Sequence, residues 1–188
     1  MNIPAGVYAG TAGTAVALTL TITGDTDVES DETIDLSLGT PTGDAFLGSQ
    51  TTTTYTINND DSVTVEFSQA TGSDAENSGG NLPVLLVTGT VVNATTVTVT
   101  DLGTGTATSG VDYSFTSPEL VNIPAGVYDG TAGTAVALTL TITGDTDVES
   151  DETIDLSLGT PTGDASLGTQ TTTTYTINND DSVTVEFS

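Results

Sequence analysis

The chain has 188 residues, 26 of them Asp or Glu, a formal charge of −26 at pH 7, and no Lys, Arg, His, Cys or Trp. Without basic side chains it cannot neutralise phosphates, which excludes nucleic acid as a partner and disfavours anionic membrane surfaces. Without His, Cys or Lys it cannot assemble a Ser–His or Cys–His nucleophile, a zinc–histidine site or a Schiff base. No apolar run approaches the length of a membrane span, so membrane insertion is not expected.

An internal repeat organises the chain, because residues 2–68 recur as residues 122–188. The only differences are Ala9 against Asp129, Phe46 against Ser166, and Ser49 against Thr169. Identity this high indicates recent tandem duplication and a longer parent array. We therefore interpret residues 1–61 as the C-terminal part of one repeat, residues 62–181 as a complete repeat, and residues 182–188 as the first strand of the next.

Apolar residues alternate with Thr or Ser in five segments of the complete repeat, and a short apolar run and one further segment are also typical of strands, whereas no segment has a useful helical period. In chain order the strands are expected at 62–67, 83–88, 95–100, 119–123, 134–143, 153–158 and 171–177. Clusters of Gly, Asn, Asp and Pro separate them. Residues 1–61 would contain only the equivalents of the last four of these strands. The pattern predicts an all-β fold, an antiparallel β-sandwich with Greek-key connections.

One face of each strand should point into the sandwich, because side chains alternate along a strand. The residues expected to face inward are Val63, Val65, Phe67, Leu86, Val97, Val99, Val136, Leu138, Leu140, Ile154, Leu156, Leu158, Tyr175 and Ile177.

Three motifs together resemble the Calx-beta domain: GTATSGVDYSF at 105–115, GDTDVESDETIDLSL at 144–158, and TYTINNDDSVTVEF at 174–187. That family has a Gly-x-Ala-x-x-Gly-x-Asp-Tyr turn, an Asp-rich loop followed by Glu-x-x-Glu, and a last strand ending in Ile-x-Asn/Asp-Asp. The resemblance covers the complete repeat and most of the partial one. It implies an immunoglobulin-like sandwich, and the low complexity and near-identical copies are similar to the tandem repeats of bacterial surface and matrix proteins.

The resemblance also implies Ca²⁺, which takes about six to eight oxygen ligands, usually from several loops. In the complete repeat the implied ligands are Glu76, Asp112, Asp145, Asp147, Glu149, Glu152, Asp180 and Asp181. The partial copy repeats part of this set as Asp25, Asp27, Glu29, Glu32, Asp60 and Asp61. Crowded carboxylates without cations must otherwise repel or share protons. The alternative is that they are solvated loop residues with ordinary turn roles.

These features favour a structural repeat of an extracellular bacterial adhesin, matrix fibre or filament, made rigid by Ca²⁺ where repeats join. No free linker is expected, because the last strand ends at Asp181 and the next unit begins at Ser182. The partners would be neighbouring copies, in one chain or head to tail in a homopolymer. The alternative function is a calcium-sensing module that regulates a partner domain. An enzyme is not expected, because no aromatic platform accompanies the carboxylate pairs that could hydrolyse glycosides.

The partial first copy lacks its first three strands and would expose an apolar face and an open sheet edge. We consider two completions. Preceding residues of a longer array would supply the missing strands, or residues 182–188 of another copy would donate one. Sequence reasoning favours the longer array, because one donated strand leaves two others missing.

Overall fold

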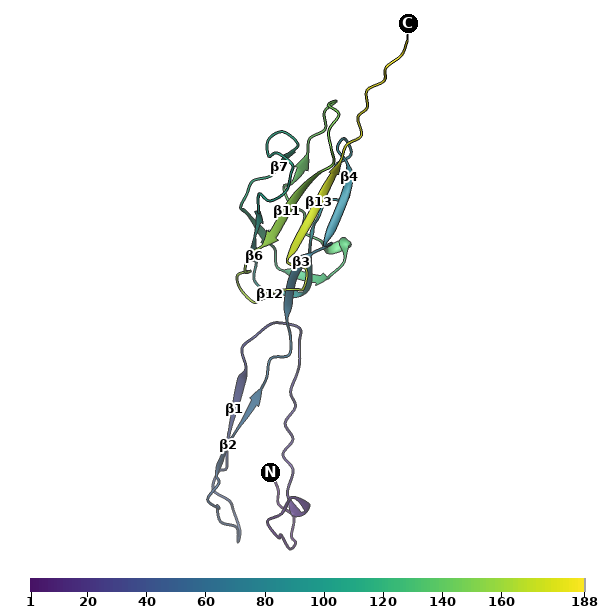
Figure 1. The fold of residues 1–188 in the computed structure, drawn as a ribbon. Helices are drawn as coiled ribbons and strands as arrows, with labels where there is room; N and C mark the ends of the chain where they lie inside the picture. Colours follow the sequence, from purple (N-terminus) through teal and green to yellow (C-terminus); the bar gives the residue numbers. More distant parts are fainter. Residues whose placement is uncertain (188) are drawn as a thin grey trace.

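The computed structural model describes residues 1–187, which are almost entirely strand and loop. The complete repeat is a sandwich of two main sheets (Figure 1). One sheet has the order β4(Thr71–Ala75), β13(Thr172–Asn178), β11(Glu152–Leu158), β6(Thr95–Asp101) and β8(Glu119–Ile123). The other has the order β12(Ala165–Leu167), β3(Val63–Phe67), β5(Leu85–Val91) and β9(Gly126–Asp129). The predicted β-sandwich is confirmed, although β4 pairs with β13, and β12 with β3, in parallel.

The long alternating segments gave the most accurate strand predictions. Strands β6, β8, β11 and β13 lie within a residue of their expected bounds, and β3 does too, whereas β5 begins two residues late and continues to Val91. Four short strands were not predicted: β4, β7(Tyr113–Ser114), β9 and β12. They contain Gly, Ser or Asp, or have too few residues to show an alternation.

The prediction of one continuous strand over 134–143 is wrong. The segment follows the 3-10 helix η2(Ala132–Thr134), and Val136 then bridges to Leu85 of the four-stranded sheet. Further along, β10(Thr141–Ile142) pairs with β7 in a separate two-stranded sheet. The segment therefore pairs with different strands along its length. The alternation of Thr and Leu indicates which side chains face inward, but it does not require a continuous ladder of backbone hydrogen bonds.

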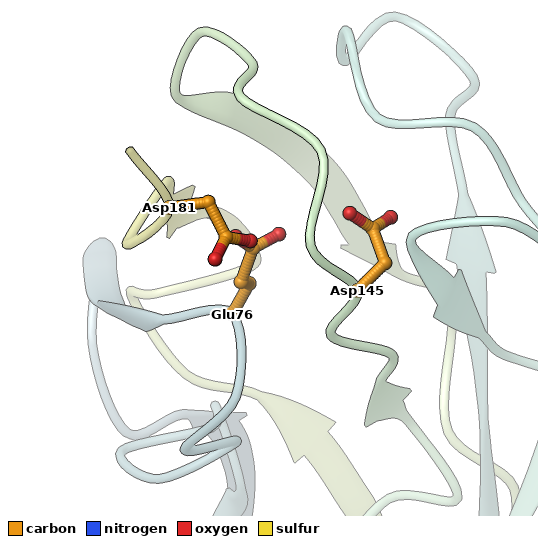
Figure 2. Close-up of side chains that lie close together, drawn as sticks. All are labelled: Glu76, Asp145 and Asp181. Carbon is orange, nitrogen blue, oxygen red and sulfur yellow. The ribbon is translucent and has the colours of Figure 1, made fainter. Parts of the chain in front are cut away.

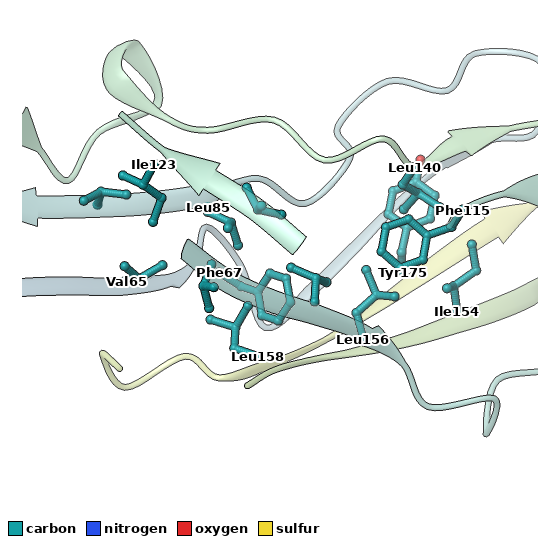
Figure 3. Close-up of a cluster of buried hydrophobic side chains, with 14 of the residues drawn as sticks. Val65, Phe67, Leu85, Phe115, Ile123, Leu140, Ile154, Leu156, Leu158 and Tyr175 are labelled. Carbon is teal, nitrogen blue, oxygen red and sulfur yellow. The ribbon is translucent and has the colours of Figure 1, made fainter. Parts of the chain in front are cut away.

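The core lies between the two sheets and contains most of the residues predicted to face inward (Figure 3). Leu86 is an exception, because Leu85 and Val87 are fully buried and Leu86 is only half-buried. The run of consecutive apolar residues in β5 has no alternation to fix its face, so the prediction there was one residue out of register. Val136 and Leu138 are also only partly buried. The core further includes Val91, Tyr113, Phe115, Val121 and Ile123, which were not predicted.

The partial first copy forms much less structure than its sequence twin. Among the described residues 1–61, the strands are the hairpin β1(Glu32–Ser37) and β2(Thr52–Ile57), with a 3-10 helix η1(Ala12–Thr14) before it. Of the last four strands expected there, only the final two form. Their register matches that of β11 with β13, since Ile34 pairs with Tyr55 as Ile154 pairs with Tyr175. The hairpin is therefore a local property of the sequence.

Burial is not a local property, because identical residues differ between the copies. Tyr55 is 48% exposed and Tyr175 is 1% exposed, while Leu20 is 43% exposed and Leu140 is 3% exposed. The complete repeat covers these side chains with strands that the first copy lacks. Residues 182–187 likewise form no strand and extend away from the sandwich, because no neighbouring strand pairs with them (Figure 1). Residue 188 lies outside the described residues.

Substitution of Leu140 and of its twin Leu20 tests this difference. Leu140→Ala should lower the free energy of unfolding by about 2–5 kcal/mol, because it leaves a cavity in a packed core. Leu20→Ala should cost less than about 1 kcal/mol, because that side chain is already exposed. Urea denaturation of the full chain measures both. Equal costs for the two variants would contradict the assigned core.

Candidate metal centre

Loops of the complete repeat bring acidic residues to the pole of the sandwich where β13 ends. Glu76 follows β4, Asp145 lies between β10 and β11, and Asp181 follows β13. One carboxylate oxygen from each lies within 4.8 Å of the others. Figure 2 shows Glu76 and Asp181 side by side, with Asp145 facing them from the neighbouring loop. Three segments that are distant in the sequence thus contribute to one group.

Glu76 is placed by the parallel pairing of β4 with β13. Ala75 is in register with Asn178, and the Glu76 backbone N–H donates to the Asn178 carbonyl oxygen at 3.1 Å. The Glu76 side chain is 6% exposed, and its Oε1 accepts a hydrogen bond from the Asp180 backbone at 3.4 Å. Burial raises the pKa of Glu76, and the charges of Asp145 and Asp181 raise it further. A carboxylate is therefore held in a place that favours its neutral form.

Asp181 carries the least satisfied oxygen of this group. Its Oδ2 is buried and has no hydrogen-bond partner among the described residues. A buried carboxylate oxygen without a partner costs more free energy than a neutral polar atom would, because charge is strongly hydrated in water. No side chain of this chain can supply a compensating positive charge, since Lys, Arg and His are absent. A bound cation would satisfy this oxygen.

A second acidic group lies beside the first and consists of Asp112, Glu149 and Glu152, again with one oxygen from each within 4.8 Å of the others. Asp112 is 7% exposed, and its Oδ2 accepts a hydrogen bond from the Thr108 backbone at 2.6 Å. Burial, a hydrogen bond with Asp112 and the charges around it raise the pKa of Glu152 to about 7. Glu152 thus retains a proton close to neutral pH when no cation is bound.

The tyrosine next to Asp112 fixes the turn that presents it. The Tyr113 hydroxyl donates to Asp101 Oδ2 at 2.5 Å, and the Asp112 carbonyl oxygen accepts from the Thr143 backbone at 2.8 Å. Burial raises the pKa of Tyr113 to about 12, so the phenol remains a donor at physiological pH. The two residues of the Asp-Tyr motif therefore have different roles. The phenol anchors the turn, and the carboxylate belongs to the acidic group at the pole.

Two residues that sequence reasoning did not single out hold the acidic loop in place. Asn179 Oδ1 accepts from the Glu149 backbone at 2.9 Å, and Asn179 Nδ2 donates to the Asp181 carbonyl at 3.0 Å. Asp151 Oδ1 accepts from the Asn179 backbone at 3.1 Å. The first copy repeats this arrangement with Asn59 and Asp31. The available signal was the Asn-Asn-Asp-Asp sequence at the end of both last strands, where an amide can bridge two loops.

The structure does not gather every predicted ligand. Asp147 and Asp180 belong to neither group, and both are exposed. Asp147 instead donates its backbone N–H to Asp145 Oδ1 at 2.7 Å, which closes a tight turn and orients the Asp145 carboxylate. The six predicted residues of the first copy line one open hollow: Asp25, Asp27, Glu29, Glu32, Asp60 and Asp61. Among the described residues of that copy, no three carboxylates come as close together as in the complete repeat. The counterparts of Glu76 and Asp112, which precede the partial copy in the repeat, are missing there.

The donor set of both groups fits a hard divalent cation. All candidate ligands are carboxylate oxygens, which Ca²⁺ and Mg²⁺ prefer, whereas zinc favours nitrogen and sulfur. The buried, unpartnered oxygen of Asp181 is independent of this chemical argument and points to the same conclusion. The residues present therefore fit a calcium-type ion.

Solved structures with a similar fold include Calx CBD domains. The apo form of the Calx CBD1 domain matches with a TM-score of 0.50 and 21% identity, over 64% of this chain and all of that domain. CBD12 from CALX1.2 matches with a TM-score of 0.51 and 22% identity, over 63% of this chain and 44% of that one. At this identity the likeness shows the fold, and it confirms at that level the resemblance inferred from the three motifs. No protein-family model and no curated protein matches the chain.

The raised pKa of Glu152 predicts how stability depends on pH. The usual pKa of a Glu is 4.5 and that of Glu152 is about 7, so the folded state binds more protons than the unfolded state between these values. The metal-free fold therefore loses stability as pH rises across this window. Glu152→Gln removes that loss, so the stability of this variant relative to the unmodified chain should increase from about pH 4 to about pH 8.

Urea denaturation of metal-free protein at several pH values measures this change. Glu32→Gln is the matched control, because the first copy has no counterpart of Asp112 beside Glu32. A Glu152→Gln curve parallel to that of the unmodified chain would show that the pKa of Glu152 is not raised in the folded state.

Proposed function

We propose that the complete repeat binds Ca²⁺ at this pole and serves as a structural unit of an extracellular bacterial repeat protein, such as an adhesin stalk, matrix fibre or filament. The observation that carries the calcium proposal is the buried and unpartnered Oδ2 of Asp181 beside buried Glu76. The likeness to the Calx CBD fold supports it. Near-identical tandem copies favour a structural function over a calcium-sensing module, because a sensor needs few equivalent sites.

Two neighbouring ions account for the two acidic groups. Glu76, Asp145 and Asp181 would hold one, and Asp112, Glu149 and Glu152 would hold the other. The ion supplies the positive charge that the chain itself lacks. The protein contributes the positioning, because Asn179 and the Asp147 turn fix the loops before any ion arrives. Binding would release the proton that Glu152 retains near neutral pH.

The joint between repeats supports the structural part of the proposal. Asp61 is followed directly by Ser62 and β3, so the connection has no free linker. Val28, from the acidic loop of the first copy, packs against the core of the complete repeat. Beside it, the hydroxyl groups of Thr26 and Thr90 lie 3.0 Å apart. The loop that carries the candidate ligands is thus the same loop that contacts the next repeat, which couples ion binding to the stiffness of the joint.

A calcium titration of the full chain tests the metal proposal. Ligand that binds only the folded state stabilises it by mass action, by about 2.7 kcal/mol at a hundredfold excess over Kd. Added CaCl₂ should therefore raise Tm, and Asp181→Asn should remove most of that rise. Asp61→Asn is the matched control, because the first copy lacks the counterpart of Glu76. Identical melting curves in CaCl₂ and EGTA would exclude a functional calcium site.

The joint is tested by comparing Val28 with its twin Val148, which is 53% exposed and has no following repeat in this chain. Because the chain has no native cysteine, single cysteines introduced at exposed Ser49 and Thr116 can carry a pair of spin labels. Val28→Asp should broaden the distance distribution between the labels, since it buries a charge at the joint. Val148→Asp should leave the distribution unchanged. Equal distributions for both variants would show that the Val28 contact does not stiffen the joint.

A further inference from the structure

Residues 58–62 connect β2 of the first copy with β3 of the complete repeat. Figure 1 shows the chain passing through this connection directly from the hairpin into the sandwich. Asn59 lies in the connection and is half-buried. A change in the angle between the two copies must therefore alter the backbone of residues 58–62 or the contacts that hold it.

Asn59 ties the connection to the acidic loop of the first copy, residues 24–31, by three hydrogen bonds. Its Oδ1 accepts from the Glu29 backbone N–H at 3.0 Å, and its Nδ2 donates to the Asp61 carbonyl oxygen at 2.9 Å. Its own backbone N–H donates to Asp31 Oδ1 at 2.9 Å. The Glu29 N–H belongs to the peptide group that follows Val28. Asn59 therefore holds the peptide next to the residue that packs on the core of the complete repeat.

A glycine of the complete repeat lies at the other end of the connection. Gly89 has a φ of +113°, and a Cβ at this position would collide with the Ser62 carbonyl oxygen. Strand β5 ends its pairing with β3 just before this glycine. The next residue, Thr90, then forms a parallel bridge with Asp27 of the acidic loop. The same strand thus contacts both the end of the connection and the loop that Asn59 holds.

An uncharged amide suits the position of Asn59, because the segments that it joins repel each other. Burial raises the pKa of Asp61, and the charges of Asp60, Asp25 and Asp27 raise it further. A carboxamide can accept a hydrogen bond from one segment and donate one to the other. A carboxylate could only accept and would add to the repulsion. No cationic side chain exists in this chain to join the two segments instead.

We propose that Asn59 is a positioning residue of the joint, whose carboxamide fixes the acidic loop of one repeat to the chain that enters the next and so keeps Val28 on its apolar contact. The amide holds the two segments together against the repulsion of their carboxylates. This proposal rests on the structural part of the proposed function and does not require calcium. An ion would reduce the repulsion that the amide opposes, so the two act on the same loop by different interactions.

Asn59→Leu tests the proposal, because leucine is similar in size, adds no charge and makes no side-chain hydrogen bond. With spin labels at positions 49 and 116 and with EGTA present, this substitution should broaden the distance distribution, as Val28→Asp does. Asn179→Leu is the matched control, since Asn179 makes the same three bonds within the complete repeat. It should leave the distribution unchanged. The melting curve of the complete repeat should be the same for Asn59→Leu and the unmodified chain, because Asn59 lies outside that repeat.

Asn59→Asp separates the two functions of the amide. It keeps an oxygen that accepts from the Glu29 N–H, but it replaces the donor to the Asp61 carbonyl with a second acceptor. It should therefore broaden the distribution as well. Asn58→Asp is the control for charge, because Asn58 is the exposed neighbour and does not take part in the three bonds. It should leave the distribution unchanged.

An Asn59→Leu distribution equal to that of the unmodified chain would overturn the proposal. Equal broadening by Asn59→Leu and Asn179→Leu would overturn it too, because the effect would not be specific to the joint. The same holds for equal broadening by Asn58→Asp and Asn59→Asp, which would attribute the effect to charge. If Val28→Asp broadens the distribution and Asn59→Leu does not, this proposal fails and the proposed joint contact stands. If Val28→Asp has no effect, the joint contact itself fails. The calcium titration is independent of both results, because every label measurement contains EGTA.

Discussion

The absence of every cationic side chain is the constraint on which the rest of this structure depends. Each carboxylate has to be stabilised by water, by N–H and O–H donors, or by an external ion. At most structural positions, the carboxylate is stabilised by N–H and O–H donors. Glu66, Asp74 and Asp129 accept hydrogen bonds from nearby backbone and hydroxyl groups, which lower their pKa values. The high Thr and Ser content therefore supplies donors as well as strand-forming side chains.

At the acidic pole the pKa shifts have the opposite direction, which distinguishes these residues from ordinary loop carboxylates. Burial and neighbouring negative charge raise the pKa values of Glu76, Glu149 and Glu152. The hydrogen bond from the Asp180 backbone offsets these effects only in part at Glu76, and one oxygen of Asp181 has no partner among the described residues. A solvated loop would relax such strain by turning its side chains outward. Here hydrogen bonds of Asn179 and Tyr113 hold the loops that carry these carboxylates, as expected of a site shaped for a cation.

The sequence was sufficient where a pattern repeats along a single strand. The alternation of Thr with apolar residues located β6, β11 and β13, and it identified Ile154 and Tyr175 as core. It failed where the outcome depends on partners elsewhere in the chain. Residues 134–143 alternate as a strand does, yet they divide between two sheets. The face of β5 could not be assigned either, because apolar residues are consecutive there.

The candidate site shows the same division between local and distant information. The motifs predicted which loops are acidic, and the structure selects six carboxylates from those loops. Asp147 and Asp180 have the right residue type at the right end of the fold, but both are exposed and belong to neither group. The choice depends on turns closed by backbone hydrogen bonds, and on the parallel pairing that places Glu76 next to the end of β13. Neither is visible in composition or spacing.

The two near-identical copies act as an internal comparison of what a half repeat can do alone. The hairpin β1–β2 keeps the register of its twin without a core around it, so this local pairing does not depend on burial. Burial and the acidic groups appear only when β3, β4 and the turn at Asp112 are added. The joint between the two copies therefore does three things at once: it continues the chain into β3, seats Val28 on the core of the complete repeat, and holds together loops of like charge. The first two favour association and the third opposes it. Because the opposing interaction is electrostatic, an ion bound at the acidic pole, as proposed above, would change the balance without altering the apolar contact or the strand pairing.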